Sequence, residues 1–289
     1  MKIRVKKVNA FTDSLNGGNP AGVVLDSLAL SDEQMKQVTR ELKVSESAFV
    51  HPSDIADYKL RFFSPLVEVE LCGHATIATF FTLALEGVFT RDTVVRQETK
   101  AGVLSVNIFF KDSDVVDRVM MTQGKPIYKD IYFDISHIAD SLRISVDDID
   151  DTFPKQIVST GLFTLPVCIK SFAVLKDMKP DFDKVKGLCK QIGAGSFHLY
   201  TFETLESDST YHARNFCPLY GVNEDPVTGT ANGAVCSYLY NNGFVKEKNM
   251  ICEQGNIIGR PGRVFVEVDL NTVRVGGRAR LVEEKEIEV

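Results

Sequence analysis

Two short segments of the chain share one pattern, and both carry polar groups where a buried core should have none. Residues 71–76 read Leu-Cys-Gly-His-Ala-Thr, and residues 225–231 read Asp-Pro-Val-Thr-Gly-Thr-Ala. Each segment opens an uncharged, mostly apolar stretch of helical character, and each follows an Arg-x-Phe-x-Pro sequence, at residues 61–65 and 214–218. The repetition predicts a duplicated structural unit in which a helix begins at the same point of each copy.

The glycines of the two copies keep the same spacing. Gly73 lies 14 residues before Gly87, and Gly229 lies 14 residues before Gly243. A helix that is apolar nearly all round must be covered on every side. Each half is therefore expected to hold many strands and one fully wrapped helix, at about residues 74–86 and 231–241.

This pattern predicts an α+β fold with two pseudo-symmetric domains, each a mostly antiparallel β-sheet or barrel wrapped around a central α-helix. A parallel doubly wound sheet would need a regular alternation of strands and helices, which the chain lacks. We place the N-terminal half at residues 1–118 and the C-terminal half at residues 119–279. We allow the C-terminal tail, about residues 280–289, to return to the first half, and we expect the active site in the cleft between the halves.

Local signals place the remaining elements. Ser31 and Gln34 form a capping-box pattern, and Met35, Val38 and Leu42 then fall on one helical face. Asp181 is the expected cap of a helix that runs to residue 192. Residues 119–136 are the candidate crossover between the halves. Strands are expected at residues 3–11, 48–50, 58–63, 94–97, 103–109, 115–121, 156–160, 167–175, 197–202, 210–216 and 264–270.

Charge and composition exclude several classes of function. The net charge of −6 argues against nucleic acid or an anionic membrane as the main partner. Residues 1–13 lack the apolar core of a signal peptide. The longest uncharged runs, residues 71–85 and 226–245, contain polar residues, which favours buried core helices over membrane spans. We therefore expect a cytoplasmic protein.

The cysteines and histidines do not follow the spacing of metal sites. The six cysteines are scattered without a C-x-x-C pair, and the five histidines show neither H-x-H nor H-E-x-x-H spacing. This usage is typical of reduced, cytosolic thiols and not of a disulfide framework or a zinc site. No structural or catalytic metal is expected.

The repeated glycines are candidates for ligand binding. A buried helix start leaves backbone N–H groups without intrahelical partners, and a glycine there lets a ligand approach the backbone. Gly73 and Gly229 could each be simple tight turns, but their matched positions favour a pair of anion sites suited to a carboxylate. His74, beside the first of them, could act as an acid or a base near neutral pH.

Three further residues could have either a structural or a functional role. By composition alone, Glu46 reads as an exposed carboxylate at a strand start, and Asp225 as a helix cap or turn residue. Cys72 is tempting as a thiol catalyst, because cofactor-free racemases of this architecture use two cysteines, one from each half. Its counterpart before Gly229 is Thr228, so the second thiol is missing. A two-thiol racemase is disfavoured, and Cys72 is expected to be a small buried residue.

Taken together, the motifs resemble one known family over nearly the whole chain, the phenazine-biosynthesis PhzF-like isomerases of the diaminopimelate-epimerase-like fold. The motifs that carry the resemblance are Asn-Ala-Phe-Thr at residues 9–12, Gly-Asn-Pro-Ala-Gly-Val at 18–23, Ser-Glu-Ser-Ala-Phe-Val at 45–50, Arg-Phe-Phe-Ser-Pro at 61–65, Glu-Val at 68–69, Leu-Cys-Gly-His-Ala-Thr at 71–76 and Glu-Asp-Pro-Val-Thr-Gly-Thr-Ala at 224–231.

The resemblance implies two similar domains, a site in the cleft between them, a homodimer and no cofactor. The family's general base, the glutamate of its Ser-Glu-x-Ala-Phe segment, falls on Glu46. The histidine of Gly-His-Ala-Thr falls on His74, and the aspartate of Asp-Pro-x-Thr-Gly falls on Asp225. The serine that follows Thr-Gly in the family is here Thr230, which keeps a hydroxyl and adds a methyl group. The candidate substrate-binding residues are Asn19, Gly73, Gly229 and Thr230.

These residues predict a cofactor-independent isomerase that moves a proton, and with it a double bond, on a small carboxylate. An amino- or hydroxy-acid racemase or epimerase is an alternative of the same class. A non-catalytic small-molecule-binding protein of the same fold is an alternative of another class, and the presence of Glu46, His74 and Asp225 together argues against it. The sequence leaves the substrate and its pathway open.

Overall fold

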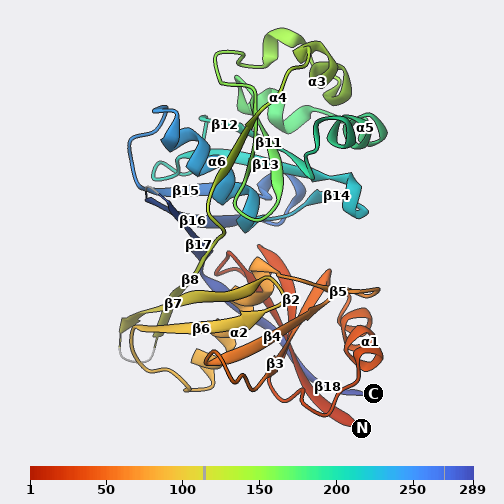
Figure 1. Cartoon of the computed structure of the whole chain (residues 1–289), viewed down its shortest axis with the longest axis vertical. Coiled ribbons are helices and arrows are strands. Elements are labelled where there is room, and N and C mark those ends of the chain that lie inside the picture. The colour runs from red at the N-terminus through yellow and green to blue at the C-terminus, as the bar shows by residue number, and fades with distance from the viewer. Residues whose placement is uncertain (113–114, 270) are drawn as a thin grey trace. The chain divides into compact units, whose positions relative to one another are not determined.

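A computed structural model of the chain describes residues 1–112, 115–269 and 271–289. Two compact units make up the chain: Met1–Thr122 together with Gly276–Val289, and Gln123–Val275. In each unit the strands surround one helix, which is α2 (Gly73–Leu85) in the first and α6 (Gly229–Asn241) in the second (Figure 1). The predicted α+β fold class is confirmed.

The first unit contains two helices and most of the long strands. Its second helix, α1, spans Asp32–Leu42. The last strand of the chain, β18, pairs antiparallel with the first, β1, and β1 also pairs antiparallel with β2. The strands of this unit are β1 (Lys2–Ala10), β2 (Asn19–Val24), β3 (Glu46–His51), β4 (Tyr58–Phe63), β5 (Glu68–Val69), β6 (Thr93–Thr99), β7 (Gly102–Asp112), β8 (Val115–Thr122) and β18 (Ala279–Glu288).

The second unit repeats this plan and adds outer helices. Besides α6 it has α3 (Ile135–Leu142), α4 (Phe172–Asp177) and α5 (Phe182–Ile192). Its strands are β9 (Ile127–Asp130), β10 (Gln156–Ser159), β11 (Phe163–Cys168), β12 (Ser196–Thr201), β13 (Tyr211–Cys217), β14 (Val222–Asp225), β15 (Asn249–Gln254), β16 (Gly262–Asp269) and β17 (Thr272–Gly277), the last of which runs beyond the end of the unit.

The order of strand pairing is the same in both units. In the first, β2 is parallel to β3, β3 is antiparallel to β4, and β4 is parallel to β6. In the second, β11 is parallel to β12, β12 is antiparallel to β13, and β13 is parallel to β15. Parallel neighbours need a crossover connection, and α1, α2, α5 and α6 supply the four crossovers. The sheets are mostly antiparallel, as predicted, but each contains two parallel pairs that the pattern of the sequence did not reveal.

The matched glycine spacing has a structural cause. Gly73 and Gly229 are the first residues of α2 and α6, while Gly87 and Gly243 follow the ends of these helices with φ of +76° in both cases. A left-handed residue after a helix favours glycine, because glycine has no Cβ to clash. Each glycine pair therefore marks the beginning and the end of one 13-residue helix.

The buried helix α2 carries three threonines without leaving their hydroxyls unpaired. Thr76, Thr79 and Thr82 are fully buried. Their hydroxyls donate to the carbonyls four residues earlier, at O···O distances of 2.9, 2.7 and 2.7 Å. Burying a hydroxyl is costly unless it is hydrogen-bonded, so these local bonds make a polar sequence compatible with a central helix.

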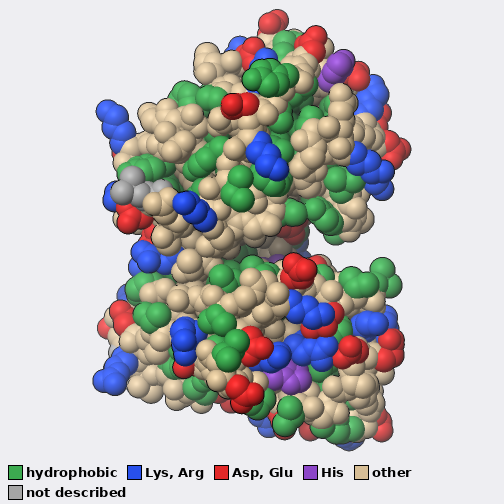
Figure 2. All heavy atoms as spheres, viewed as in Figure 1, with side chains coloured by type: hydrophobic (Ala, Val, Ile, Leu, Met, Phe, Trp, Pro, Cys, Tyr) green, Lys and Arg blue, Asp and Glu red, His purple; other side chains and the backbone are tan. Residues whose placement is uncertain are grey.

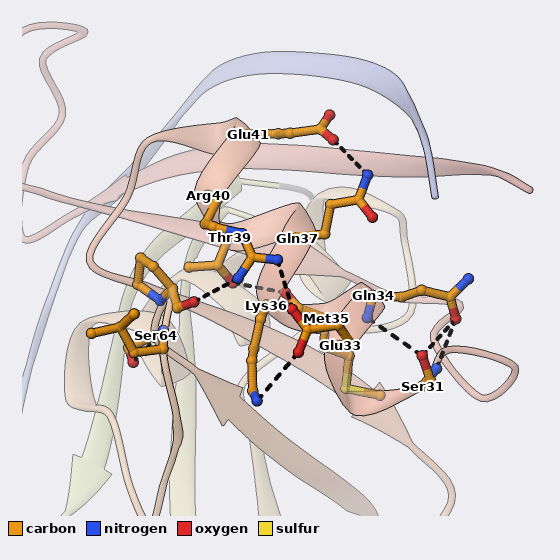
Figure 3. Close-up of polar contacts among 12 residues, drawn as sticks. Ser31, Glu33, Gln34, Met35, Lys36, Gln37, Thr39, Arg40, Glu41 and Ser64 are labelled. Atoms are coloured by element: carbon orange, nitrogen blue, oxygen red, sulfur yellow. Dashed lines mark hydrogen bonds and ion pairs between the residues drawn. The ribbon is translucent and has the colours of Figure 1, made fainter.

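Helix α1 covers the outside of the first unit, and Figure 3 shows its polar contacts. The predicted capping box is confirmed, since Ser31 and Gln34 each accept from the other's backbone N–H. On the inner face Met35, Val38 and Leu42 are buried, as predicted. The outer face carries exposed pairs such as Arg40 with Glu33 at 2.9 Å.

The arginine of the repeated Arg-x-Phe-x-Pro sequence is structural. Arg61 makes two bonds of 2.9 Å to Glu68, and its guanidinium lies 4.9 Å from the ring centre of Phe63. Arg214 pairs in the same way with Glu224, at 2.9 and 2.8 Å, and lies 4.9 Å from the ring centre of a phenylalanine two residues on. A bidentate pair fixes the position of the arginine relative to its glutamate. The same pairing in both units accounts for the arginine of the repeated Arg-x-Phe-x-Pro sequence.

Some predicted elements differ from the structure. Residues 167–175 were expected to be one strand, but β11 ends at Cys168 and α4 begins at Phe172, where Ser171 caps the helix by accepting from the N–H of Val174. The expected crossover at residues 119–136 contains β9 and the start of α3. Helices of six to eight residues make about two turns, which is too few for a clear apolar period. Leu270, the end of the last predicted strand, lies outside the described residues.

Two further findings concern membrane-spanning helices and the distribution of charge on the surface. In the part of the chain that the structure describes, no helix combines the length and the apolar character needed to cross a membrane. On the face shown in Figure 2, acidic and basic side chains are interspersed.

Candidate active site

Glu46 and His74, which are 28 positions apart in the sequence, lie side by side in the first unit. Glu46 is the first residue of β3, and His74 is the second residue of α2. The Oε2 atom of Glu46 is 3.4 Å from Nε2 of His74, and the Ser45 hydroxyl is 3.5 Å from the same nitrogen. The side chains of Glu46 and His74 are 25% and 12% exposed, so both can meet a ligand. A carboxylate beside an imidazole can exchange protons with a bound molecule.

Cys72 completes this group. It is the N-cap residue of α2 and is buried, as predicted. Its Sγ lies 3.4 Å from Nδ1 and 3.7 Å from Nε2 of His74. At the same position of α6 the N-cap residue is Thr228. The structure therefore bears out the repeat alignment, in which a threonine replaces the second thiol.

The start of α2 is open to a small ligand. The side chain of the N-cap residue, Cys72, makes no capping hydrogen bond to this helix. A Cβ built on Gly73 would meet only the Met121 sulfur, at 3.7 Å. The first N–H groups of a helix attract negative charge. A carboxylate group of a substrate is a suitable partner for this position.

In the second unit, Gln254 organises the segment that carries Asp225. The Gln254 side-chain NH₂ donates to the Asp225 carbonyl at 2.9 Å and to the Thr228 hydroxyl at 3.1 Å. Its side-chain oxygen accepts from the backbone N–H of Thr228 at 3.1 Å and from the Asn232 amide at 2.8 Å. The Thr228 hydroxyl in turn donates to the Asp225 carboxylate. The glutamine thus satisfies all its polar groups while fixing one loop.

Gly229 and Thr230 open α6 just beyond this loop. Gly229 is buried and Thr230 is half-buried. The backbone oxygen of Thr230 accepts from the Thr160 hydroxyl at 3.2 Å. A Cβ on Gly161 would stand 3.5 Å from the Thr230 methyl group, so this methyl occupies space beside the helix start. A serine in its place would leave that space open.

Asn19 is the first residue of β2 and is buried. Because β2 runs parallel to β3, Ala21, two residues further along, pairs with Glu46. Asn19 therefore lies on the strand next to the one that begins with Glu46.

The predicted site residues fall into two groups, one in each unit. Asn19, Glu46, Gly73 and His74 belong to the first, and Asp225, Gly229 and Thr230 belong to the second. Within the first, Glu46 and His74 are in contact. The location of the active site in the cleft between the halves, and the role of each residue, stay predictions.

Two residues that contact these groups had not been predicted as site residues: Cys72, which was expected to be a small buried residue, and Gln254. Contact of Cys72 with His74 could have been suspected from their two-residue spacing. Gln254 belongs to the repeated glutamine and glutamate pairs at residues 97–98 and 253–254. In the first unit, Thr76 donates to Gln97 at 3.3 Å, so both copies use a glutamine to hold the first turn of the central helix.

Comparison with known proteins supports the resemblance. The family described as phenazine biosynthesis-like protein matches residues 8–285. An uncharacterized isomerase of Bacillus subtilis (strain 168), YfhB, is 37% identical over 266 residues, which cover 92% of this chain and 90% of that protein. An uncharacterized isomerase of Clostridium acetobutylicum, CA_C3446, is 34% identical, with 99% and 98% of the two chains covered.

Solved structures agree. A Bacillus anthracis phenazine biosynthesis protein of the PhzF family has a TM-score of 0.91 and 33% identity, with 100% of both chains covered. A hydroxyproline epimerase from Agrobacterium vitis shares the fold with a TM-score of 0.65 at 16% identity, covering 99% of this chain and 91% of that one. The relatives indicate an enzyme of the isomerase or epimerase type. This chain belongs to the phenazine biosynthesis-like protein family.

Proposed function

We propose that the protein is a cofactor-independent isomerase that moves a proton, and hence a double bond, on a small carboxylate by general acid–base catalysis. The contact between the Glu46 carboxylate and the His74 imidazole at the start of α2 is the observation that carries this proposal. It supplies two proton-exchanging groups beside a helix start suited to an anion.

In the proposed mechanism Glu46 takes a proton from a carbon of the substrate and becomes a neutral carboxylic acid. The electron pair of the broken C–H bond moves into the adjacent π system, and the proton returns at a different carbon. Removing a proton from carbon is possible only if the developing negative charge is stabilised as it forms. Backbone N–H groups at the start of α2 are suitable donors for that charge, because they are already oriented.

His74 and Asp225 have supporting roles in this proposal. His74, whose Nε2 atom lies 3.4 Å from Oε2 of Glu46, exchanges protons with polar groups of the substrate. Asp225, held by Thr228 and Gln254, binds a polar group of the substrate, and Gly229 and Thr230 contribute the second helix start. The additional methyl group of Thr230 narrows the shape of substrate that fits. The homodimer implied by the family resemblance stays a prediction.

A solvent-exchange screen tests the proposal even though the substrate is unidentified. Small unsaturated acids and amino acids would be incubated with the enzyme in D₂O, and deuterium uptake at carbon would be followed by NMR. Uptake accompanied by a shifted double bond is the expected result. Loss of an α-hydrogen with inversion of configuration and no shifted double bond would favour a racemase or epimerase instead.

Cys72→Ala should keep a substantial part of the turnover. Thr228 stands at the equivalent N-cap of α6, so a mechanism with one thiol on each face of the substrate has no second thiol at that place. The measurement is the rate of the variant on any substrate that the wild type converts. Complete and selective inactivation by a thiol reagent, reproduced by Cys72→Ser in a folded protein, would reverse the ranking of isomerase over racemase.

Gln254→Glu should lower kcat/KM by about 10²-fold, because small displacements of positioning groups are that costly. The variant keeps the acceptor of Thr228 and Asn232 but loses the NH₂ group that holds Asp225. The matched control is Gln191→Glu, an exposed glutamine on α5 of the same unit. Equal kinetics in both variants would remove Gln254 from the site.

A further inference from the structure

Three potential metal ligands of different chemistry meet in the first unit. One ligand atom each from Glu46, Cys72 and His74 lies within 4.8 Å of the others. Two of these residues come from the start of α2 and the third from the start of β3. The group is therefore complete within one unit and does not depend on the other.

Two of the three distances are close to those between ligands of a tetrahedral ion, and the third, from Glu46 to Cys72, is at most 4.8 Å. Zinc binds sulfur at about 2.3 Å and nitrogen or oxygen at about 2.0–2.2 Å. A tetrahedron with those bonds has ligand-to-ligand edges of about 3.3–3.6 Å. In the structure, Nε2 of His74 is 3.4 Å from Oε2 of Glu46 and 3.7 Å from Sγ of Cys72. The sulfur lies slightly nearer to Nδ1 of the ring, at 3.4 Å, so the side chains of Cys72 and His74 would have to rotate for all three atoms to face one ion.

Charge and exposure favour a soft divalent cation. A Cys72 thiolate and the Glu46 carboxylate carry two negative charges, which balance one divalent ion while His74 binds as a neutral imidazole. The partly exposed carboxylate and imidazole give the ion a path from solvent. A sulfur and nitrogen ligand set selects zinc or cobalt over magnesium or calcium. The Ser45 hydroxyl, 3.5 Å from Nε2 of His74, is a candidate oxygen for the fourth ligand.

We propose that Glu46, Cys72 and His74 form a binding site for a divalent transition-metal ion of the zinc type, and that the bound ion inhibits the enzyme. On binding, the Cys72 thiol releases its proton to solvent and its sulfur bonds to the ion. The metal bonds to an oxygen of Glu46 and a nitrogen of His74 and draws electron density from both groups, so neither is basic enough to take a proton from a substrate. The proposed metal binding does not depend on the isomerase function proposed above, whereas the proposed inhibition does.

Cobalt(II) is the probe, since its spectrum reports both the ligands and the geometry. Reduced, chelator-treated protein would be titrated with Co²⁺ without oxygen. One equivalent should produce a thiolate-to-cobalt charge-transfer band in the near ultraviolet, together with visible bands typical of tetrahedral cobalt. Zn²⁺ should displace the ion and abolish the bands. The absence of the charge-transfer band in the wild-type protein would overturn the proposal.

Two variants of proposed ligands and one control variant test the site. Cys72→Ala should lose the charge-transfer band, whereas Cys189→Ala should keep it, because Cys189 is buried in the core and burial raises the pKa of its thiol to about 12. Glu46→Gln keeps the thiol and should weaken binding more than roughly 100-fold, since even outer-shell changes cost 10–100-fold. Circular dichroism would verify that each variant is folded. A band retained in Cys72→Ala, or unchanged affinity in Glu46→Gln, would refute the site.

The rate of turnover with and without the metal ion is the second measurement. Micromolar Zn²⁺ should inhibit the wild-type enzyme, and a chelator should restore its rate. Full turnover with the ion bound would overturn the inhibition while leaving the optical signal of binding in place. The optical titration needs no substrate, so a failure of the proposed isomerase function would be seen separately in the solvent-exchange screen.

Discussion

Replacement of Glu46 with glutamine should lower turnover by at least about 10²–10⁴-fold, the usual worth of a general acid–base group. Glutamine has nearly the same shape, so the start of β3 and its neighbour His74 should keep their positions. What the variant lacks is a group that can accept a proton from carbon. The rate would be measured on any substrate that the wild type converts, together with ligand affinity, which should change little.

The matched control for this experiment is Glu41→Gln. Glu41 is an exposed carboxylate on α1 of the same unit, hydrogen-bonded to Gln37. Its replacement removes the same charge from the exposed surface of α1, outside the contact between Glu46 and His74, and should leave the rate unchanged. Near-normal turnover in Glu46→Gln would eliminate the mechanism and make His74 the next candidate base.

The second prediction with a large expected effect concerns Glu253 and the stability of the folded protein at low pH. Glu253 is 1% exposed. It accepts hydrogen bonds from the His212 ring at 2.9 Å and from the N–H groups of Leu205 and Glu206 at 2.9 and 2.6 Å. Burial alone would raise the pKa of Glu253, but these bonds outweigh it and lower the pKa from 4.5 to about 2. Such a shift corresponds to about 3 kcal/mol of stability at neutral pH.

The lowered pKa of Glu253 determines the pH range in which its carboxylate stabilises the folded protein. Because the pKa of Glu253 is lower in the folded protein, its contribution is complete above about pH 4.5 and is lost as the pH falls towards about 2. Glu253→Gln should therefore reduce the free energy of unfolding by about 3 kcal/mol at pH 7 and flatten its decline in acid. The chain has no tryptophan, so urea unfolding would be followed by far-ultraviolet circular dichroism.

Glu267→Gln is the control for Glu253. Glu267 lies on β16 of the same unit and pairs with Arg274 at 2.7 Å, with both side chains partly exposed. Surface pairs of this kind contribute at most about 1 kcal/mol. Equal destabilisation by the two substitutions would show that the buried hydrogen bonds of Glu253 are not the source of its effect.

The parts of the fold that the sequence predicted are those fixed by local chemistry. Ser31 and Asp181 cap their helices as expected because capping depends on a few neighbouring residues. The central helices were recognisable because Gly73 and Gly229 begin them and the intervening residues are apolar on every side. These signals are short in range and can be seen without knowing the tertiary structure.

What the sequence did not reveal depends on contacts between distant segments. The parallel pairing of β2 with β3 requires α1 to carry the chain back to the end of the sheet where β2 began, and no local pattern encodes that return. The four hydrogen bonds of Gln254 join residues between 22 and 29 positions away. The contact of Glu46 with His74 was not predicted. Only the family resemblance made Glu46 a catalytic candidate beside His74, because by composition Glu46 reads as an exposed carboxylate.

The antiparallel pairing of β1 with β18 has a consequence for how the protein is made. The second unit is one continuous stretch, whereas the first consists of two stretches that flank it. At a synthesis rate of about 5–20 residues per second, the partner strand of β1 is made on the order of tens of seconds after β1 itself. For that time one edge of its hydrogen-bonding ladder is open, and such edges invite pairing with other chains. The whole second unit is thus synthesised before β18 can pair with β1 and complete the first unit. The first unit is therefore the part of the nascent chain that chaperones would need to protect.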